Sequence, residues 1–135
     1  MQILRLASSS HAAADQLEDW GTVGDPIGLP VCTLRGKKMA AHDAGGPDIG
    51  IWECSPGRYR RQILSAESMH ILAGEAVFTP DGGTPVTLVA GDVVLFPAGT
   101  LGEWEIKVAL RKMYVVLDPA AGLAPARHAA HAAPG

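Results

Sequence analysis

The sequence lacks an apolar run long enough to cross a membrane, and it lacks an excess of basic residues. A membrane-spanning helix needs about 20 consecutive, mostly apolar residues, and no stretch of this chain approaches that length. The chain has 11 basic and 14 acidic residues, for a formal net charge of -3. Its densest basic run, residues 58–61, would split between two faces of a strand, because neighbouring residues point to opposite sides. We therefore expect neither a membrane protein nor a nucleic-acid-binding protein.

Cysteine is also scarce, since the chain has only Cys32 and Cys54 and no CxxC motif. The opening segment MQILRLASSSHAAAD has no basic start followed by an apolar stretch of the length that directs export. We therefore expect a cytoplasmic protein with reduced thiols. A disulfide between the two cysteines stays an open alternative, because its geometry cannot be tested from the sequence.

The chain nevertheless has enough apolar residues for a folded core. It is 135 residues long, 47% hydrophobic and 19% charged, which is typical of one globular domain and not of a disordered chain. From residue 24 onward, Gly and Pro separate short runs rich in Val, Ile, Leu and aromatic residues, the pattern of strands joined by turns. The predicted strands cover residues 31–34, 38–42, 49–54, 59–64, 68–72, 75–79, 86–89, 93–96, 103–108 and 111–117. This pattern predicts an all-β sandwich or barrel, with a hairpin tip at residues 80–83.

The two ends of the chain have a different composition from the strand region. Ser10 can cap a short helix that continues through Gln16, Leu17 and Glu18. We therefore predict an N-terminal arm with this helix at residues 1–30, the barrel at 31–118 and a tail rich in Ala, Pro and His at 119–135. His128 and His131 have a spacing that can bind a metal on a helix, but no third ligand is near, and a solvated tail is the preferred interpretation.

Two stretches of the chain resemble the paired motifs of the cupin superfamily. They are PGRYRRQILSAESMHILAGEAVFTPDGG and GDVVLFPAGTLGEWEIKVALRKMYVVL, and the resemblance spans about residues 48–117. Glu67 and Gly74 match the end of the first cupin motif, and Gly91, Pro97 and Gly99 match the second. The resemblance implies a single-domain cupin (RmlC-like) jelly-roll β-barrel.

Within the superfamily, the chain looks most like the small single-domain group related to the cupin domain of (S)-ureidoglycine aminohydrolase. That resemblance implies an enzyme of ureide or related C–N hydrolysis, with a manganese site of glutamate, histidine and glutamine. His70 and Gln62 are the candidates for a displaced site of this kind. On regular strands, however, His70 points away from Glu67, and Gln62 points away from Arg61 and Ile63.

The usual metal ligands of a cupin are mostly missing from this sequence. Counting back from Glu67 places the two expected histidines on Arg61 and Ile63, and counting forward from Gly99 places the third on Gly102. A divalent ion needs three or four converging donors, and a lone carboxylate does not hold it against bulk water. We therefore expect no metal and no other cofactor, with manganese as the alternative. We predict that an Arg61–Glu67 pair takes the place of the metal.

Strand alternation predicts the lining of a pocket inside the barrel. If Glu67 points inward, so do Tyr59 and Arg61 on one strand and Gly102 and Trp104 on another. Arg61 would bind a carboxylate, Glu67 would accept a hydrogen bond from an amine or amide, and the rings would cover apolar atoms. Gly102 would leave open space beside Trp104. The predicted function is binding of a small polar or anionic metabolite, with Glu67 as the candidate catalytic residue if a reaction occurs.

A purely structural interpretation stays open beside the binding site. Glu67 and Arg61 can form a buried ion pair that closes the barrel, and the indoles of Trp52 and Trp104 can be core. In this interpretation Lys112 and Tyr114 lie on a solvated edge. A homodimer is the expected assembly in either case, because the edges of a small barrel need covering.

Overall fold

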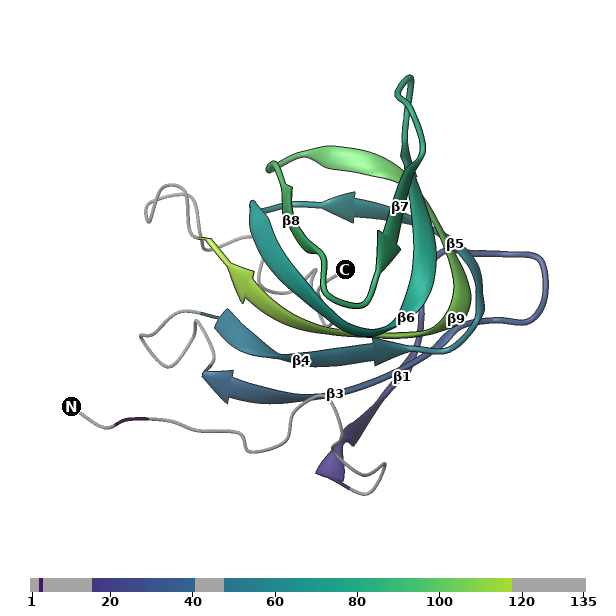
Figure 1. Ribbon diagram of the computed structural model, residues 1–135. Coiled ribbons are helices and arrows are strands. Elements are labelled where there is room, and N and C mark those ends of the chain that lie inside the picture. Colours follow the sequence, from purple (N-terminus) through teal and green to yellow (C-terminus); the bar gives the residue numbers. More distant parts are fainter. Residues whose placement is uncertain (1–2, 4–15, 41–47, 118–135) are drawn as a thin grey trace.

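The protein folds as a curled antiparallel sheet (Figure 1). The computed structural model describes residues 3, 16–40 and 48–117, and these residues contain nine strands and no α-helix. The strands are β1 (Glu18–Thr22), β2 (Pro26–Ile27), β3 (Thr33–Ala40), β4 (Asp48–Cys54), β5 (Gly57–Ile63), β6 (Glu67–Pro80), β7 (Val86–Val89), β8 (Val93–Phe96) and β9 (Thr100–Val116). The predicted all-β barrel is confirmed.

The longest strand, β9, lies at the centre of the sheet. Its first half pairs with β5 and its second half with β4, while β6 pairs with it along most of its length. β6 in turn pairs with β8 near its start and with β7 near its end. β4, β5 and β6 are therefore all held against β9, and these pairings close the barrel.

β6 is continuous where two separate strands were predicted. Its register against β9 shifts at Ile71, Ala73 and Glu75, so the strand bends without ending. Gly74 makes the bend possible, because its φ is 92° and a Cβ there would lie 2.1 Å from the Ala109 carbonyl oxygen. The predicted strands at 86–89 and 93–96 match β7 and β8 in full.

The prediction of an N-terminal helix reaching residue 18 is wrong for the part that the structure describes. Glu18 begins β1, which pairs with β3, and Pro26 and Ile27 form β2 against β5. Strand pairing with the barrel outweighs the modest helical preference of a short segment. The rest of the predicted helix, and the tail with His128 and His131, lie outside the described residues.

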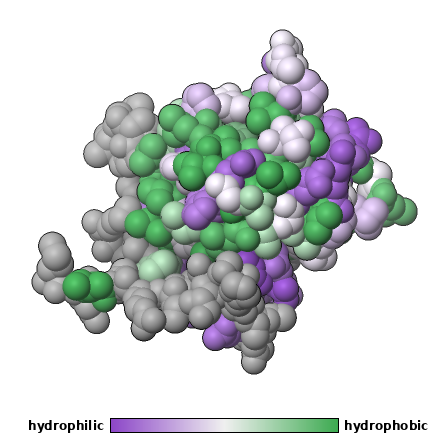
Figure 2. Space-filling view, in the orientation of Figure 1, coloured by the Kyte–Doolittle hydropathy of each residue, from purple (hydrophilic) through white to green (hydrophobic). Residues whose placement is uncertain are grey.

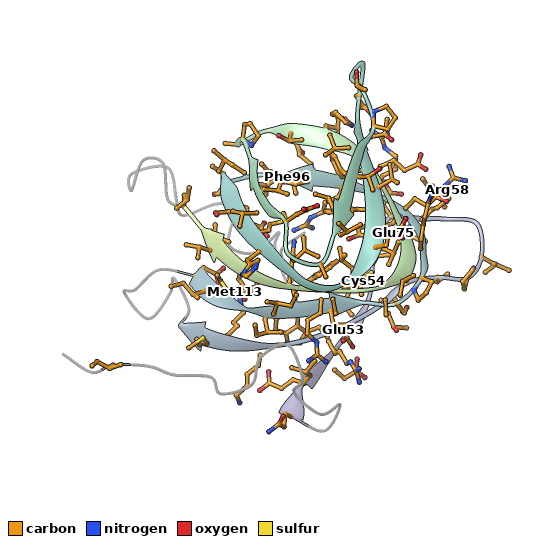
Figure 3. The ribbon with its side chains drawn as sticks, in the orientation of Figure 1. Glu53, Cys54, Arg58, Glu75, Phe96 and Met113 are labelled. Carbon is orange, nitrogen blue, oxygen red and sulfur yellow. The ribbon has the colours of Figure 1, made fainter. Side chains whose placement is uncertain are left out.

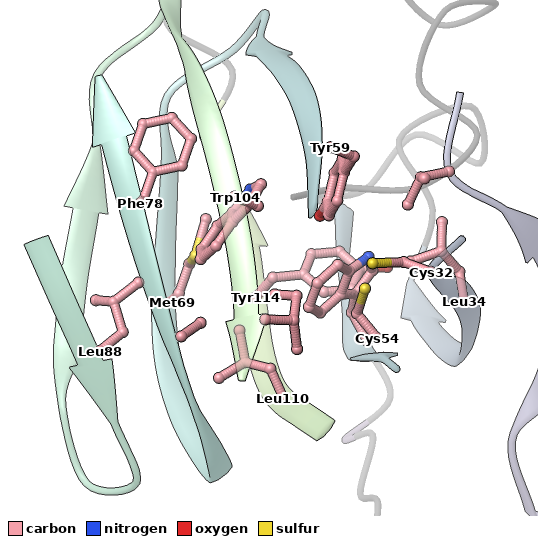
Figure 4. Packing of buried hydrophobic residues seen from close by; sticks show 14 of the residues in the cluster. Cys32, Leu34, Cys54, Tyr59, Met69, Phe78, Leu88, Trp104, Leu110 and Tyr114 are labelled. Atoms are coloured by element: carbon pink, nitrogen blue, oxygen red, sulfur yellow. The ribbon is translucent and has the colours of Figure 1, made fainter. Parts of the chain in front are cut away.

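The core fills the inside of the barrel with aromatic and branched side chains (Figure 4). Phe96 stacks on Trp104 with centroids 5.6 Å apart, and Phe78 meets both rings edge-on, at 4.9 and 5.1 Å from Phe96 and Trp104. Trp52 lies 6.4 Å from Trp104 and is also buried. Both indoles are core, one of the two roles that the sequence left open for them.

Some apolar side chains are left on the outside of the barrel. Val93 and Leu95 of β8 are 72% and 61% exposed, and apolar residues gather around β8 on the face turned to the viewer (Figure 2). The inward neighbour Phe96 is buried, so β8 alternates as a strand with one face on the core (Figure 3).

Candidate functional site in the barrel interior

The inward positions of β5 and β9 follow the predicted alternation. Tyr59 and Ile63 are buried and Arg61 is partly buried, while Arg60 between them is also partly buried and Gln62 is exposed. On β9 the residues paired with Tyr59 and Arg61 are Trp104 and Gly102, and both are buried. The structure therefore places Tyr59, Arg61 and Trp104 on the inner side of the barrel.

A buried ion pair lies at the centre of this interior. Lys112 Nζ is 3.0 Å from Glu67 Oε2, and the two residues are 0% and 3% exposed. The ammonium also lies 4.4 Å from the centroid of the Trp52 ring, 5.7 Å from that of Trp104 and 3.4 Å from Met69 Sδ. A carboxylate, two π faces and a sulfur thus replace the water that a lysine ammonium loses on burial.

The expectation that Lys112 and Tyr114 lie on a solvated edge is wrong. β9 is a central strand, with β4 on one side and β6 on the other, so its inward side chains are covered. Lys112 is paired with Trp52 on β4 and Ile71 on β6, and both neighbours are buried. Lys112 has the same strand parity as Trp104, and this signal could have placed it on the inner face from the sequence.

The partner that the structure gives to the Glu67 carboxylate is therefore Lys112, and Arg61 is a second cation in the same interior. Burial lowers the pKa of Lys112, the nearby Glu67 carboxylate opposes that shift, and the Arg61 charge adds to it. The Arg61 charge is thus close enough to act on the Lys112–Glu67 pair. We refer to Arg61, Glu67 and Lys112 as the interior charge cluster.

A second polar contact lies on the face of β4 that also carries Trp52. Asp48 is 3% exposed and accepts a hydrogen bond from Lys38 Nζ at 3.3 Å. Burial raises the pKa of Tyr114, and the charges of Asp48 and Glu67 raise it further. Asp48 is paired in charge by Lys38.

The predicted alternative metal ligands do not converge with Glu67. His70 is exposed and Glu67 is buried, so the two side chains lie on opposite faces of β6. Gln62 is exposed on β5. Within residues 16–40 and 48–117, no three His, Cys, Asp or Glu side chains come together as a metal site would require. His42 lies outside the described residues.

Gly102, the third expected histidine position, is closely packed, so the predicted open space beside Trp104 is wrong. A Cβ at Gly102 would lie 2.3 Å from the Thr79 carbonyl oxygen and 2.8 Å from Phe78 Cζ. Backbone and ring atoms of β6 occupy the volume that a side chain would need. Gly102 allows β6 to approach β9, and it does not line a cavity.

A groove on the outer side of the sheet holds a second charged group that the sequence did not reveal. Glu53 lies on the outer side of β4 (Figure 3), where it accepts hydrogen bonds from Arg35 Nε and, at 2.9 Å, from Arg111 Nε. The groove has a volume of about 560 Å³. Its lining consists of Leu17, Asp19, Thr33, Leu34, Arg35, Glu53, Ser55 and Ala109.

The chain belongs to the EutQ-like cupin family. The family model described as the EutQ-like cupin domain matches residues 42–114, which is more than half of the chain. This match confirms the predicted cupin resemblance. It does not show the finer resemblance to ureidoglycine aminohydrolase.

Solved structures with the same fold include proteins of this family. A protein of unknown function of the DUF861 family from Pseudomonas syringae pv. tomato superposes with a TM-score of 0.68 at 23% identity. The match covers 80% of this chain but only 46% of that protein, so this chain spans less than half of its length. The EutQ protein of Clostridium difficile gives a TM-score of 0.57 at 17% identity, over 68% of this chain and 75% of that one.

A further match is a putative ethanolamine utilization protein Q from Salmonella typhimurium. It gives a TM-score of 0.55 at 20% identity, over 64% of this chain and 69% of that one. At these identities the similarities show the fold alone. A search of curated protein sequences found no significant match. Among the described residues there is no helix of the length and apolar character that would span a membrane.

We predict that the buried ion pair is coupled. Changing Lys112→Met or Glu67→Met alone leaves one buried charge without its partner, and each should lower the free energy of unfolding by about 3–5 kcal/mol. The double variant removes both charges and should be more stable than either single variant. Urea unfolding followed by circular dichroism measures all three. Losses that simply add in the double variant would contradict the coupling.

A matched control for this cycle is the exposed pair of Arg60 and Asp81, whose Nη2 and Oδ2 atoms are 2.7 Å apart. Arg60→Met should change the free energy of unfolding much less than Lys112→Met, because water solvates the carboxylate that is left behind.

We predict that Gly102→Ala destabilises the protein through overpacking. A methyl group would overlap the Thr79 carbonyl, and an overfilled core costs about 1–3 kcal/mol. Gly24→Ala is the matched control, because a Cβ there meets no atom within 4 Å. Thermal and urea unfolding should show a loss for the first variant only. Equal stability of the two variants would show that β6 can move away from Gly102.

We predict that stability falls at alkaline pH. Burial raises the folded-state pKa of Tyr59, Tyr114, Cys32 and Cys54 above their ordinary values of 10.0 and 9.0. The unfolded chain then releases these protons first, so stability is full below about pH 9 and declines above it. The lowered pKa of Lys112 would make stability rise with pH, but this is one group, whereas four groups make stability fall. Urea unfolding between about pH 7 and 10 tests this, and Tyr59→Phe should make the decline shallower.

Proposed function

We propose that the barrel interior binds a small anionic metabolite, such as a carboxylate, at the interior charge cluster. The observation that carries this proposal is that two cationic side chains, Arg61 and Lys112, lie near each other in the barrel interior beside Glu67. Two neighbouring cations away from bulk water attract an anion, and a guanidinium matches the geometry of a carboxylate.

Each member of the cluster has a role that fits its chemistry. Arg61 is the partly exposed cation, and its planar guanidinium suits a carboxylate bound through two hydrogen bonds. Lys112 supplies a second positive charge, and its ammonium is held in place by Glu67 and the indole of Trp52. Glu67 can accept a hydrogen bond from an amine or amide of the ligand. The wall predicted from Tyr59 and Trp104 requires the interior to open for a ligand, because both rings are packed in the core.

A second candidate role is purely structural, and one observation favours it. Lys112 and Glu67 satisfy each other at 3.0 Å and are almost fully buried, as in a pair that only holds two strands together. In that case β6 and β9 use the pair as a cross-link, and no ligand enters. The two roles differ in what Arg61 does, because only the binding role requires its guanidinium to meet a ligand.

An enzyme of ureide C–N hydrolysis is the third hypothesis, and it rests on family resemblance. It needs a general base, for which Glu67 is the candidate, and a manganese ion as Lewis acid. Manganese-dependent release of ammonia from a ureide by the purified protein would support it over the binding role.

Ligand binding is tested by thermal-shift screening of small carboxylates, ureides and amino acids, followed by calorimetric titration of each compound that stabilises the protein. We expect a carboxylate to bind without added metal. Arg61→Gln should weaken its binding about tenfold or more, because a hydrogen bond to a charged group contributes about 1.5–3 kcal/mol.

Arg58→Gln is the matched control, since Arg58 lies on the outer side of the same strand and pairs with Glu103 at 2.6 Å (Figure 3). It should leave the affinity unchanged. The proposal is wrong if no carboxylate binds, or if Arg61→Gln and Arg58→Gln affect binding equally. Unchanged melting in the whole screen, together with a large loss of stability in Lys112→Met, would support the structural role.

A further inference from the structure

Cys32 and Cys54 lie together in the core, at the end of the β3–β4 pair. Cys54 is the last residue of β4 and pairs with Leu34 of β3. Cys32 directly precedes β3. Beyond this pair, Ser55 N donates to the Thr33 carbonyl oxygen at 3.0 Å, and Thr33 N donates to Ser55 Oγ at 2.7 Å. These bonds hold the two chain segments on either side of the cysteines at a fixed separation.

The two sulfur atoms face one another in the interior (Figure 4). Both thiols are free and 0% exposed. Cys32 Sγ packs closely against Gly57, since a Cβ at that glycine would lie only 2.7 Å from the sulfur. Each thiol is a hydrogen-bond partner of the other. The pair is therefore arranged for reaction with each other and shielded from other thiols.

We propose that Cys32 and Cys54 are a modification site, at which a hydroperoxide converts the two thiols into a reversible intramolecular disulfide. In the first step, one sulfur attacks hydrogen peroxide, forms a sulfenic acid and releases one water. In the second step, the other sulfur attacks the sulfenic acid, the S–S bond forms, and hydroxide leaves with the second thiol proton as water. The two sulfurs lose two electrons, and the two peroxide oxygens gain them.

The two thiols differ in how strongly their surroundings disfavour the thiolate. Burial raises the pKa of both thiols, but it acts more strongly on Cys54, whose pKa is raised further by the neighbouring Cys32. The low thiolate fraction makes the first step slow. The second step is intramolecular, so it follows without a further reagent. Hydrogen peroxide is small and uncharged, and it can enter the core where bulky or charged thiol reagents cannot.

The disulfide would change the wall of the barrel interior. The Cys54 thiol is a hydrogen-bond partner of Tyr59, and Lys112 lies near enough for its charge to act on the thiol. Oxidation removes the thiol proton and moves Cys54 Sγ towards Cys32, so the phenol of Tyr59 loses a partner. The oxidised and reduced forms would therefore present different interiors.

The test treats the wild-type protein with hydrogen peroxide and digests it under non-reducing conditions. Mass spectrometry should find the Cys32 and Cys54 peptides joined, with the loss of two hydrogen atoms, and dithiothreitol should restore both thiols. The oxidised protein should melt at a higher temperature than the reduced one, because the bond restricts the unfolded chain. Native reduced protein should not react with the charged reagent DTNB until it is unfolded.

Single variants separate the two thiols. Cys54→Ser should accumulate a sulfenic acid on Cys32 that dimedone traps when the peroxide-treated protein is unfolded in its presence, whereas the wild-type protein should show little trapping. Three results would overturn the proposal: both thiols stay free after oxidation, oxygen is added to the cysteines independently, or the disulfide forms only between two chains. The wild-type measurement needs no variant, so it decides the question even if Cys54→Ser does not fold.

Discussion

The structure depends on the burial of one ammonium group. Lys112 is 0% exposed, and a charge in that position is tolerated only when the surroundings replace its hydration shell. Glu67 supplies the opposite charge from β6, and Trp52 supplies a ring face from β4. The Lys112 side chain thus requires both neighbours of β9, namely β4 and β6. Burial of the ion pair costs desolvation free energy, but it specifies which strands meet and in what register.

The side chains at the expected ligand positions differ from those of the metal-binding barrels that the chain resembles. Where those proteins would carry histidines, the chain has Arg61, Ile63 and Gly102, and the strands have closed in on Gly102. Lys112 and Arg61 place positive charges of the protein itself in this interior. Any chemistry inside the barrel would then start from a site whose charge varies with protonation and with the binding of an anion.

Much of the fold could be predicted from local patterns, and the inward alternation of Tyr59, Arg61 and Trp104 could be predicted with it. The predictions that were wrong concerned features that tertiary structure decides. The segment before β1 has helical residues, but pairing with β3 decides its form. β6 was divided in two because Gly74 looks like a turn, whereas it bends a continuous strand. Lys112 was missed because a charged side chain was expected in water, although its parity with Trp104 places it inside.

The proximity of Cys32 and Cys54 illustrates the same limit. Their separation in sequence carries no information on whether the thiols meet, and only the register of β3 against β4 brings them together. The groove around Glu53 likewise depends on three strands arriving side by side, since Arg35, Glu53 and Arg111 come from β3, β4 and β9. Local sequence patterns do not predict sites whose residues come from strands that are far apart in the chain.

The central position of β9 has a consequence for how the chain is made. It is the last of the described strands, and it is the pairing partner of β4, β5 and β6. On a ribosome those three strands emerge first, and they must wait for β9 with their edges and apolar faces uncovered. Long-range pairings of this kind form slowly. Closure of the barrel therefore has to wait until β9 has been synthesised.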